Sequence, residues 1–367
     1  MAEILKAHGS HNDIFVARLT PGDFASEADL RAFIRALCDR SGPYGGDGVY
    51  FCDLSPRIPE AWFFNPDGSS AEFCGNGMRC LGRVILDLRE ADAAVIRSGQ
   101  QEYTVRRGAT APQGVRQVIV EHPAVSFGPE DGGTPVVARP GPVTETRLPE
   151  LDPVLRFTAV RLPNPHLVAV VDSYAEPGLV AMGERVAARR DLFPAGANLS
   201  VLLPLGPGEV FVRTFERGAG LTASCGSGMA ASRAVYSRVG RADPDREVVI
   251  RNAGGMAAAS LRVRDGRWFP VLQGNATFVY RADVDPGQVI RSPARAAGRR
   301  AYPGGSRAYP GEFQPFPGET RAYAALDAQN AARLRAAGIE AGRPSARLAA
   351  SHRGGDGPRT GEVTAPG

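Results

Sequence analysis

The sequence has few of the features that mark membrane, secreted or nucleic-acid-binding proteins. No stretch approaches the roughly 20 consecutive apolar residues of a membrane-spanning helix, and the first residues contain no long apolar segment typical of a secretory signal. Basic residues never form a run longer than two, so the net charge of +4 does not indicate a nucleic-acid surface. We therefore expect a cytoplasmic protein that binds neither membrane nor nucleic acid.

Cysteine is also scarce. The chain has five cysteines, and an odd number without a secretory signal indicates free thiols in a reducing compartment. Cys38 lies on the apolar face of an expected helix, and Cys52 lies within an expected strand. Cys80 is expected to pack on the inner side of a helix. The spacing of Cys74 and Cys80 matches no common zinc pattern, and no lysine-centred signature of pyridoxal phosphate is present. We expect neither a metal nor a cofactor.

The bulk composition is that of an ordinary globular protein. The 367 residues, 43% hydrophobic and 22% charged, suggest two domains with an appendage. Short apolar strands broken by glycine and proline alternate with a few segments of helical spacing. We expect helices at 26–40, 75–88, 176–188 and 227–239.

One motif occurs twice. "GSSAEFCGNGMRC" contains Cys74, "GAGLTASCGSGMAAS" contains Cys225, and each of these cysteines is followed by Gly-x-Gly-Met. The two cysteines lie 151 residues apart (225 − 74), which is about one domain length. Each half of the chain has several strands, then the glycine-rich turn, then a helix. This order predicts two domains of one architecture.

A cysteine at the glycine-rich start of a helix has a distinctive chemistry. The unpaired N–H groups and the positive helix end attract a carboxylate and are expected to lower the pKa of the thiol. Two such sites facing each other could flank one carbon. One thiolate would remove a proton, the other thiol would deliver one to the opposite face, and the stereocentre would invert. A lone cysteine of this kind is usually structural, but the matched pair favours catalysis.

These motifs resemble those of the diaminopimelate epimerase family, which are cofactor-independent, two-cysteine amino acid epimerases. Further segments follow in the order found in that family: "HGSHNDIFV", "GGDGVYF", "FFNPDGSSAEFCGNGMRC", "NPHLVAVV", "FPAGANLSV" and "FERGAGLTASCGSG". The resemblance covers about residues 1–283. It implies an α/β (α+β) fold of two pseudo-symmetric domains, each a barrel-like, mostly antiparallel sheet around a central helix. The active site would lie in the cleft between them.

The resemblance also implies where the domains begin and end. The N-terminal domain would comprise residues 1–122 and 272–283, since the last strand returns to it, and the C-terminal domain residues 123–271. Residues 284–367 are rich in proline, glycine and arginine, so we expect a largely disordered tail in which 326–339 could form a short helix. A homodimer is implied by the resemblance alone.

The resemblance assigns roles to individual residues. Cys74 and Cys225 would be the acid/base pair that converts LL-diaminopimelate to meso-diaminopimelate in lysine and peptidoglycan precursor synthesis. His166 and Glu216 would assist near the reacting centre. The substrate-binding positions would be Asn12, Asn65, Gly75, Asn76, Asn164, Asn198, Glu216, Arg217, Gly226 and Ser227.

Some alternatives remain open from the sequence. His11, Gly48 and Pro163 depart from the commonest pattern of the family, and Gly48 has no side chain with which to contact a substrate. A racemase or epimerase of another amino acid on the same fold is therefore the nearest alternative. A thiol redox protein, whose Cys74 and Cys225 cycle through a disulfide, and a non-catalytic binding module are alternatives of other classes.

Overall fold

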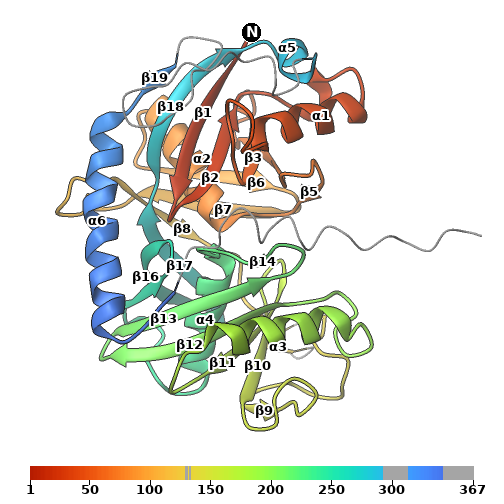
Figure 1. The fold of residues 1–367 in the computed structure, drawn as a ribbon, viewed down its shortest axis with the longest axis vertical. Helices are drawn as coiled ribbons and strands as arrows, with labels where there is room; N and C mark the ends of the chain where they lie inside the picture. The colour runs from red at the N-terminus through yellow and green to blue at the C-terminus, as the bar shows by residue number, and fades with distance from the viewer. Residues whose placement is uncertain (129–130, 132–133, 292–312, 342–367) are drawn as a thin grey trace, which may run out of the picture.

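The computed structural model describes residues 1–128, 131, 134–291 and 313–341, which form one continuous, mostly antiparallel sheet system with helices inside and outside it (Figure 1). The elements of the first half are β1 (Ala2–Gly9), β2 (Asn12–Ala17), the short 3-10 helix η1 (Pro21–Asp23), α1 (Glu27–Cys38), β3 (Gly48–Asp53), β4 (Glu60–Phe64), β5 (Ser70–Ala71), α2 (Gly75–Leu88), β6 (Ala93–Ser98), β7 (Gln101–Arg107) and β8 (Gln117–Glu121).

The second half repeats this series, and a final group of elements follows it. The elements of the second half are β9 (Thr146–Arg147), β10 (Arg156–Arg161), β11 (Pro165–Val170), α3 (Glu176–Ala188), β12 (Asn198–Gly206), β13 (Glu209–Glu216), β14 (Gly220–Leu221), α4 (Gly226–Arg238), β15 (Val248–Asn252), β16 (Gly255–Arg264) and β17 (Arg267–Asn275). The final elements are β18 (Thr277–Val284), α5 (Pro286–Arg291), β19 (Gln314–Pro315) and α6 (Pro317–Ala336).

Strand pairing confirms the internal repeat. In the first half β1 and β2 are antiparallel, β2 and β3 are parallel across α1, and β4 and β6 are parallel across α2. In the second half β10 and β11 are antiparallel, β11 and β12 are parallel across α3, and β13 and β15 are parallel across α4. Parallel neighbours need such crossover helices. Helices α1, α2, α3 and α4 correspond to the four predicted helices, and their ends lie within two residues of the predicted ends.

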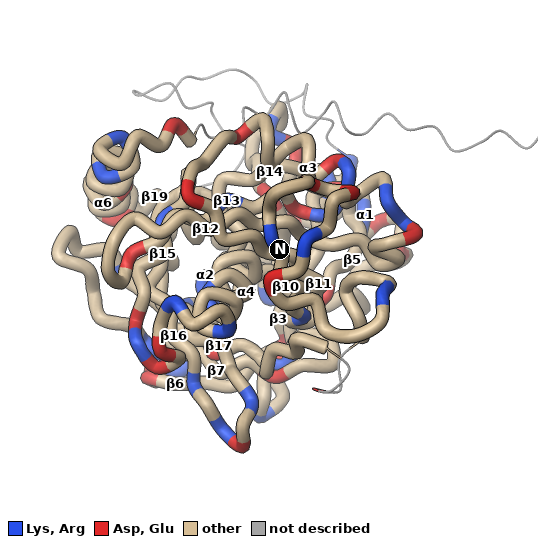
Figure 2. The backbone as a smooth tube through the Cα atoms, turned by 90° about the horizontal axis from the view of Figure 1, so that it is seen from below, with Lys and Arg blue, Asp and Glu red and all other residues tan. Residues whose placement is uncertain are grey.

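Each half wraps its sheet around one central helix. The apolar side of α2, with Met78, Leu81 and Ile85, packs into a core formed by the strands of the first half. Helix α4 is buried on all sides from Gly226 to Ser237, and its small residues let the surrounding strands approach closely. Helices α1 and α3 cover the outer faces. Seen from below, α2 and α4 lie near the centre, and charged residues are spread around the periphery (Figure 2).

Two strand pairings join the halves. Strand β17 pairs antiparallel with β16 of its own half and with β8 of the first half. Strand β18 returns to the first half and pairs antiparallel with β1, as expected for the last strand. The two halves are therefore tied by backbone hydrogen bonds directly behind the two central helices. No helix in the described part of the chain is long and apolar enough to span a membrane.

The prediction of a disordered tail over 284–367 is wrong for residues 284–291 and 313–341. Helix α6 begins at Pro317, well before the short helix expected at 326–339. Proline suits the first turn of a helix, and Tyr323, Leu326 and Leu334 bury one side of α6. Composition averaged over the whole tail conceals this helical segment. The rest of the predicted tail, residues 292–312 and 342–367, lies outside the described residues.

Candidate active site

Cys74 and Cys225 occupy equivalent places, each as the N-cap of a central helix. The Sγ atom of Cys74 accepts a hydrogen bond from the backbone N–H of Gly77 at 3.4 Å. The Sγ atom of Cys225 accepts one from Gly228 at 3.3 Å. Both thiols therefore lie at the positive, N–H-rich end of a helix, as the repeated motif predicts.

The two helix ends meet directly. A Cβ placed on Gly226 would lie 2.9 Å from Cα of Gly75, and one placed on Gly75 would lie 3.1 Å from Cα of Gly226. A side-chain amide adds a polar link, since Nδ2 of Asn76 donates to the carbonyl oxygen of Ser224 at 2.9 Å. Glycine is required at both positions because the backbones approach so closely. The two thiols are thus carried by helix ends that face each other.

Residues of β2 and β3 hold the Cys74 loop. The Cys74 thiol lies 3.5 Å from Oδ1 of Asn12, to which it donates. The backbone N–H of Cys74 donates to the hydroxyl of the buried Tyr50 at 3.1 Å. Asn12, one of the substrate-binding positions implied by the resemblance, therefore contacts the Cys74 thiol directly. The contact of Tyr50 with Cys74 was not predicted, although Tyr50 lies in the quoted segment "GGDGVYF". The contact of Tyr50 arises from strand pairing, which the sequence does not display.

A chain of amides and one histidine leads away from Cys225. Oγ of Ser227 lies 3.5 Å from Sγ of Cys225 and accepts from Nδ2 of Asn164 at 3.1 Å. Nε2 of His166 lies 3.0 Å from Oδ1 of Asn164 and 3.5 Å from Nδ2 of Asn198. Burial lowers the pKa of His166 to about 3, so its ring is neutral. The structure therefore brings together Asn164, His166 and Asn198, three of the predicted site residues.

Arg217 and Glu216 lie at the end of β13 and complete this side. The backbone N–H of Arg217 donates to Oδ1 of Asn198 at 2.8 Å. The Glu216 carboxylate accepts from the hydroxyl of Thr222. Burial raises the pKa of Glu216, while hydrogen bonds from Thr222 and Cys225 oppose that rise. Glu216 therefore sits beside the Cys225 thiol as a carboxyl that gains a proton more readily than usual.

Burial also decides the charge of the thiols. It raises the pKa of Cys74 to about 12, against the opposing hydrogen bond from Gly77. It raises the pKa of Cys225 well above its ordinary value, and the Glu216 charge raises it further. The expectation that the helix ends would lower these pKa values is wrong for this structure. Burying a thiolate away from water costs more free energy than the N–H groups of one helix end recover by stabilising it.

Strand register shows that the two halves of the site are chemically unequal. Ile14 pairs with Gly48 where β2 meets β3, and His166 pairs with Asn198 at the same place in the second half. The repeat thus matches the apolar Ile14 to His166 and the side-chain-free Gly48 to Asn198. A Cβ on Gly48 would lie 2.5 Å from the ring of Phe63. At these two positions, polar side chains therefore occur only on the Cys225 side.

Asn65 is the first-half counterpart of Glu216, since each follows the same phenylalanine of the repeat by one residue. Its Nδ2 donates to Oγ of Ser69 at 3.0 Å, within its own turn. The structure thus places Asn65 at the equivalent end of β4, but the contacts shown for it are local.

Arg79 is a buried cation that the sequence reasoning missed. Its side chain is 1% exposed, Nη2 donates to Oδ1 of Asn76 at 2.8 Å, and Nε donates to the carbonyl oxygen of Asn275 at 3.1 Å. Arg79 lies within the quoted "CGNGMR", so the motif did contain the signal. The repeat places Ala230 at the equivalent position of α4. Helix α4 has its own buried arginine, Arg233, but its guanidinium donates to the carbonyl oxygens of Ala259, Asp243 and Arg246 and not to the helix start.

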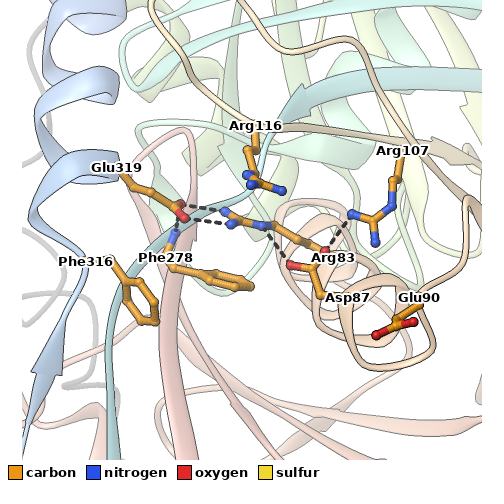
Figure 3. A pocket seen from close by; sticks show the side chains of 8 residues that line it. All are labelled: Arg83, Asp87, Glu90, Arg107, Arg116, Phe278, Phe316 and Glu319. Carbon is orange, nitrogen blue, oxygen red and sulfur yellow. Dashed lines mark hydrogen bonds and ion pairs between the residues drawn. The ribbon is translucent and has the colours of Figure 1, made fainter.

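An open hollow on the surface lies elsewhere, at the C-terminal half of α2 (Figure 3). The Arg83 guanidinium pairs with both carboxylate oxygens of Glu319, at 2.5 and 2.6 Å, and lies 3.7 Å above the Phe278 ring. Arg107 pairs with Asp87 at its rim. The ion pair between Arg83 and Glu319 joins α6 to α2 at this hollow, whose lining includes neither Cys74 nor Cys225. In the described residues, no group of three or more His, Cys, Asp or Glu is arranged to hold a metal ion.

Comparisons with known proteins point in one direction. A family profile described as diaminopimelate epimerase matches residues 158–279. A diaminopimelate epimerase of Clostridium acetobutylicum is 31% identical over 290 residues, which cover 77% of this chain and 85% of that protein. One of Methanopyrus kandleri is 33% identical over 282 residues, covering 76% of this chain and 88% of that protein.

Solved structures resemble this one in fold. A predicted epimerase of Pseudomonas aeruginosa superimposes with a TM-score of 0.55 at 15% identity, over 77% of this chain and 99% of that one. A hydroxyproline epimerase of Agrobacterium vitis does so with a TM-score of 0.51 at 16% identity, over 76% of this chain and 89% of that one. At such identities the likeness concerns the fold alone.

Proposed function

The chain belongs to the diaminopimelate epimerase family, and from this premise we propose that it interconverts LL- and meso-diaminopimelate by a two-cysteine proton transfer at Cα. The observation that carries the proposal is the meeting of two helix N-termini, each capped by a thiol. Inverting a carbon needs one group on each of its faces. The repeat supplies Cys74 and Cys225 in equivalent positions for this task.

The reaction moves one proton off the carbon and another onto it. A thiolate at one cysteine takes the α-proton and becomes a thiol, and the electron pair stays on Cα and its carboxylate. The thiol of the other cysteine then gives its proton to the opposite face and becomes a thiolate. The reverse reaction exchanges the two roles. No redox change occurs, and the atoms balance without a cofactor.

The carboxylate of the reacting centre would lie between the two helix ends. The backbone N–H groups of Gly75, Asn76, Gly226 and Ser227 are the donors that would stabilise the negative charge of the carbanion. Burial disfavours a thiolate at either cysteine. The α-ammonium of an amino acid brings a positive charge into the same space and would offset that penalty.

Polar residues on the Cys225 side would hold the part of the substrate that does not react. Arg217 supplies a guanidinium for the distal carboxylate. Glu216 lies beside the Cys225 thiol and would instead assist near the reacting centre, as an acceptor for its ammonium group. Asn164 and Asn198, joined through His166, would orient the chain between the two centres. We assign Asn12 and Asn65 to the same task on the Cys74 side.

The wider setting rests on the family resemblance. We propose that residues 1–122 with 272–283, and residues 123–271, act as the two catalytic domains of a cytoplasmic homodimer in lysine and peptidoglycan precursor synthesis. The pairing of β18 with β1 supports the return of the chain to the first domain.

Chiral separation of the products tests the proposal. Wild-type protein incubated with LL-diaminopimelate should yield meso-diaminopimelate without added cofactor, and Cys74→Ser or Cys225→Ser should each abolish the conversion. Inversion of another amino acid but not of diaminopimelate would favour a racemase of different specificity. Activity that follows the redox potential of the buffer, with no stereochemical product, would instead identify a thiol redox protein.

A further inference from the structure

We propose that Tyr323 of α6 is a positioning residue that holds the two loops on which the active site depends. Helix α6 runs along one side of both halves (Figure 1). Glu319 pairs with Arg83 of the first half near the start of the helix, and Asn330 donates to the carbonyl oxygen of Asn252 of the second half at 3.0 Å. Tyr323 lies between these two anchors. The inference rests on the proposed function of Cys74 and Cys225.

The hydroxyl of Tyr323 reaches the Cys225 loop. The side chain is 3% exposed, and its hydroxyl donates to the carbonyl oxygen of Gly254 at 2.7 Å. The N–H of Gly254 in turn donates to the carbonyl oxygen of Ala223 at 2.9 Å. Ala223 is two residues before Cys225 in the chain. Tyr323 is therefore two hydrogen bonds away from the segment that sets the position of this thiol.

The ring of Tyr323 reaches the Cys74 side. It packs edge-on against His8, with centroids 4.5 Å apart, and against His11, with centroids 4.9 Å apart. The two histidine rings stack at 5.2 Å. The next residue, Asn12, accepts the hydrogen bond from the Cys74 thiol. Tyr323 therefore supports His11, which immediately precedes Asn12, the residue in contact with the Cys74 thiol.

The loop that Tyr323 supports has an unfavourable backbone conformation. Ser10 and His11 have φ values of 55° and 59°, a left-handed region that side-chain-bearing residues seldom adopt. Contacts from outside the loop must hold it there. One turn after Tyr323, a carboxylate oxygen of Asp327 lies 3.3 Å from Nε2 of His11. The helix thus secures His11, which departs from the commonest family pattern, from two directions.

The other contacts of α6 have a different character. Leu334 packs with Phe211 and Ile339 in a small apolar cluster of the second half. This cluster fastens the helix without touching either cysteine loop. Leu334→Ala is therefore the matched control, because it weakens the docking of α6 but leaves Tyr323 and Asp327 in place. Gln329→Ala, at an exposed position whose amide bonds to Gln113, is the neutral control.

The experiment uses the full chain with Tyr323→Leu, Tyr323→Phe, Asp327→Asn and the two controls. The first readout is kcat and KM for LL-diaminopimelate. The second needs no substrate: the pH dependence of iodoacetamide alkylation at Cys74 and at Cys225, measured by peptide mass spectrometry. Melting temperatures report the stability of each variant.

We expect Tyr323→Leu to lower kcat about tenfold or more, with a smaller change in KM, because small displacements of catalytic groups are costly. Its alkylation profiles should change at both thiols. Tyr323→Phe keeps the ring against the histidines but loses the bond to Gly254, so it should alter chiefly the Cys225 profile. Asp327→Asn should alter chiefly the Cys74 profile. Leu334→Ala should lower the melting temperature and leave kcat and both profiles unchanged.

Two results would overturn the inference. One is a folded Tyr323→Leu protein with the kcat and alkylation profiles of the wild type. The other is an equal loss of kcat in Leu334→Ala at a similar melting temperature, which would reduce Tyr323 to a stabilising residue. If Tyr323→Leu does not fold, Tyr323→Phe and Asp327→Asn decide by the same criteria. If the wild type does not act on diaminopimelate, the proposed function fails, and the alkylation profiles still test Tyr323.

Discussion

Gly75 and Gly226 touch backbone to backbone where the two central helices meet, so that a Cβ on Gly226 would lie 2.9 Å from Cα of Gly75. The contact brings together two segments from opposite halves of the chain. Each of the two glycines directly follows a cysteine, so the contact also brings the Cys74 and Cys225 segments together. The closeness of the two helix ends, rather than either cysteine alone, is what makes a two-faced reaction geometrically possible.

Gly226→Ala should therefore damage catalysis more than folding. The added methyl group must push the helix ends apart by several tenths of an ångström, and we expect kcat to fall by about a hundredfold. Gly178→Ala is the matched control, because a Cβ at this position in α3 meets no atom within 4 Å. The control should keep full activity and gain up to about 1 kcal/mol of stability. A Gly226→Ala protein with near-normal kcat would contradict the proposed geometry.

The raised pKa values of the two thiols predict how stability changes with pH. A thiol whose pKa is raised to about 12 by folding, as for Cys74, binds more protons in the folded state above its unfolded pKa of about 8.5. Its contribution to stability is complete below that pH and is lost as the pH rises toward the folded value. The loss is up to about 1.4 kcal/mol per pH unit for each thiol.

Urea denaturation between pH 7 and pH 10 measures this effect. The wild type should lose stability above about pH 8.5, and the double variant Cys74→Ala, Cys225→Ala should lose less over the same interval. Equal slopes for the two proteins would show that neither thiol has the raised pKa described for it.

Arg79 provides a test of the asymmetry between the halves. Arg79→Met removes the donors to Asn76 and Asn275 and leaves two buried acceptors without them. We expect a loss of about 3 kcal/mol in the free energy of unfolding and a lower kcat. Arg31→Met is the control, since Arg31 forms an exposed i,i+4 pair with Glu27 and should change stability by less than about 0.5 kcal/mol. Equal effects of the two substitutions would remove the special role of Arg79.

Local features of the sequence predicted much of the fold and part of the site. The Cys-Gly-x-Gly blocks predict helix starts, because the N-cap and the glycines that follow it influence only the nearest residues of the chain. Helix α2 begins at Gly75 and helix α4 at Gly226, as these blocks predict. The resemblance located Asn164, His166 and Asn198, which the structure joins in one hydrogen-bonded chain.

Features that depend on tertiary contacts could not be predicted. The hydroxyl of Tyr50 meets Cys74 only because β3 lies beside the loop. The pKa values of Cys74 and Cys225 depend on burial, which a local motif does not report. The motif therefore predicted lowered pKa values, whereas burial raises both of them. The place of α6 across both halves depends on Tyr323 and Leu334 finding distant partners, which the proline- and glycine-rich composition of the tail obscures.

The most direct test of the central claim follows hydrogen at Cα during a short incubation of LL-diaminopimelate in deuterated buffer. With two bases, the meso product should carry one deuterium at the inverted carbon, delivered by a solvent-exchanged thiol, while the recovered LL substrate should carry little. Cys74→Ser and Cys225→Ser should each prevent formation of the deuterated product. Equal deuterium in the recovered substrate and the product would indicate one base acting on both faces, and would contradict the account.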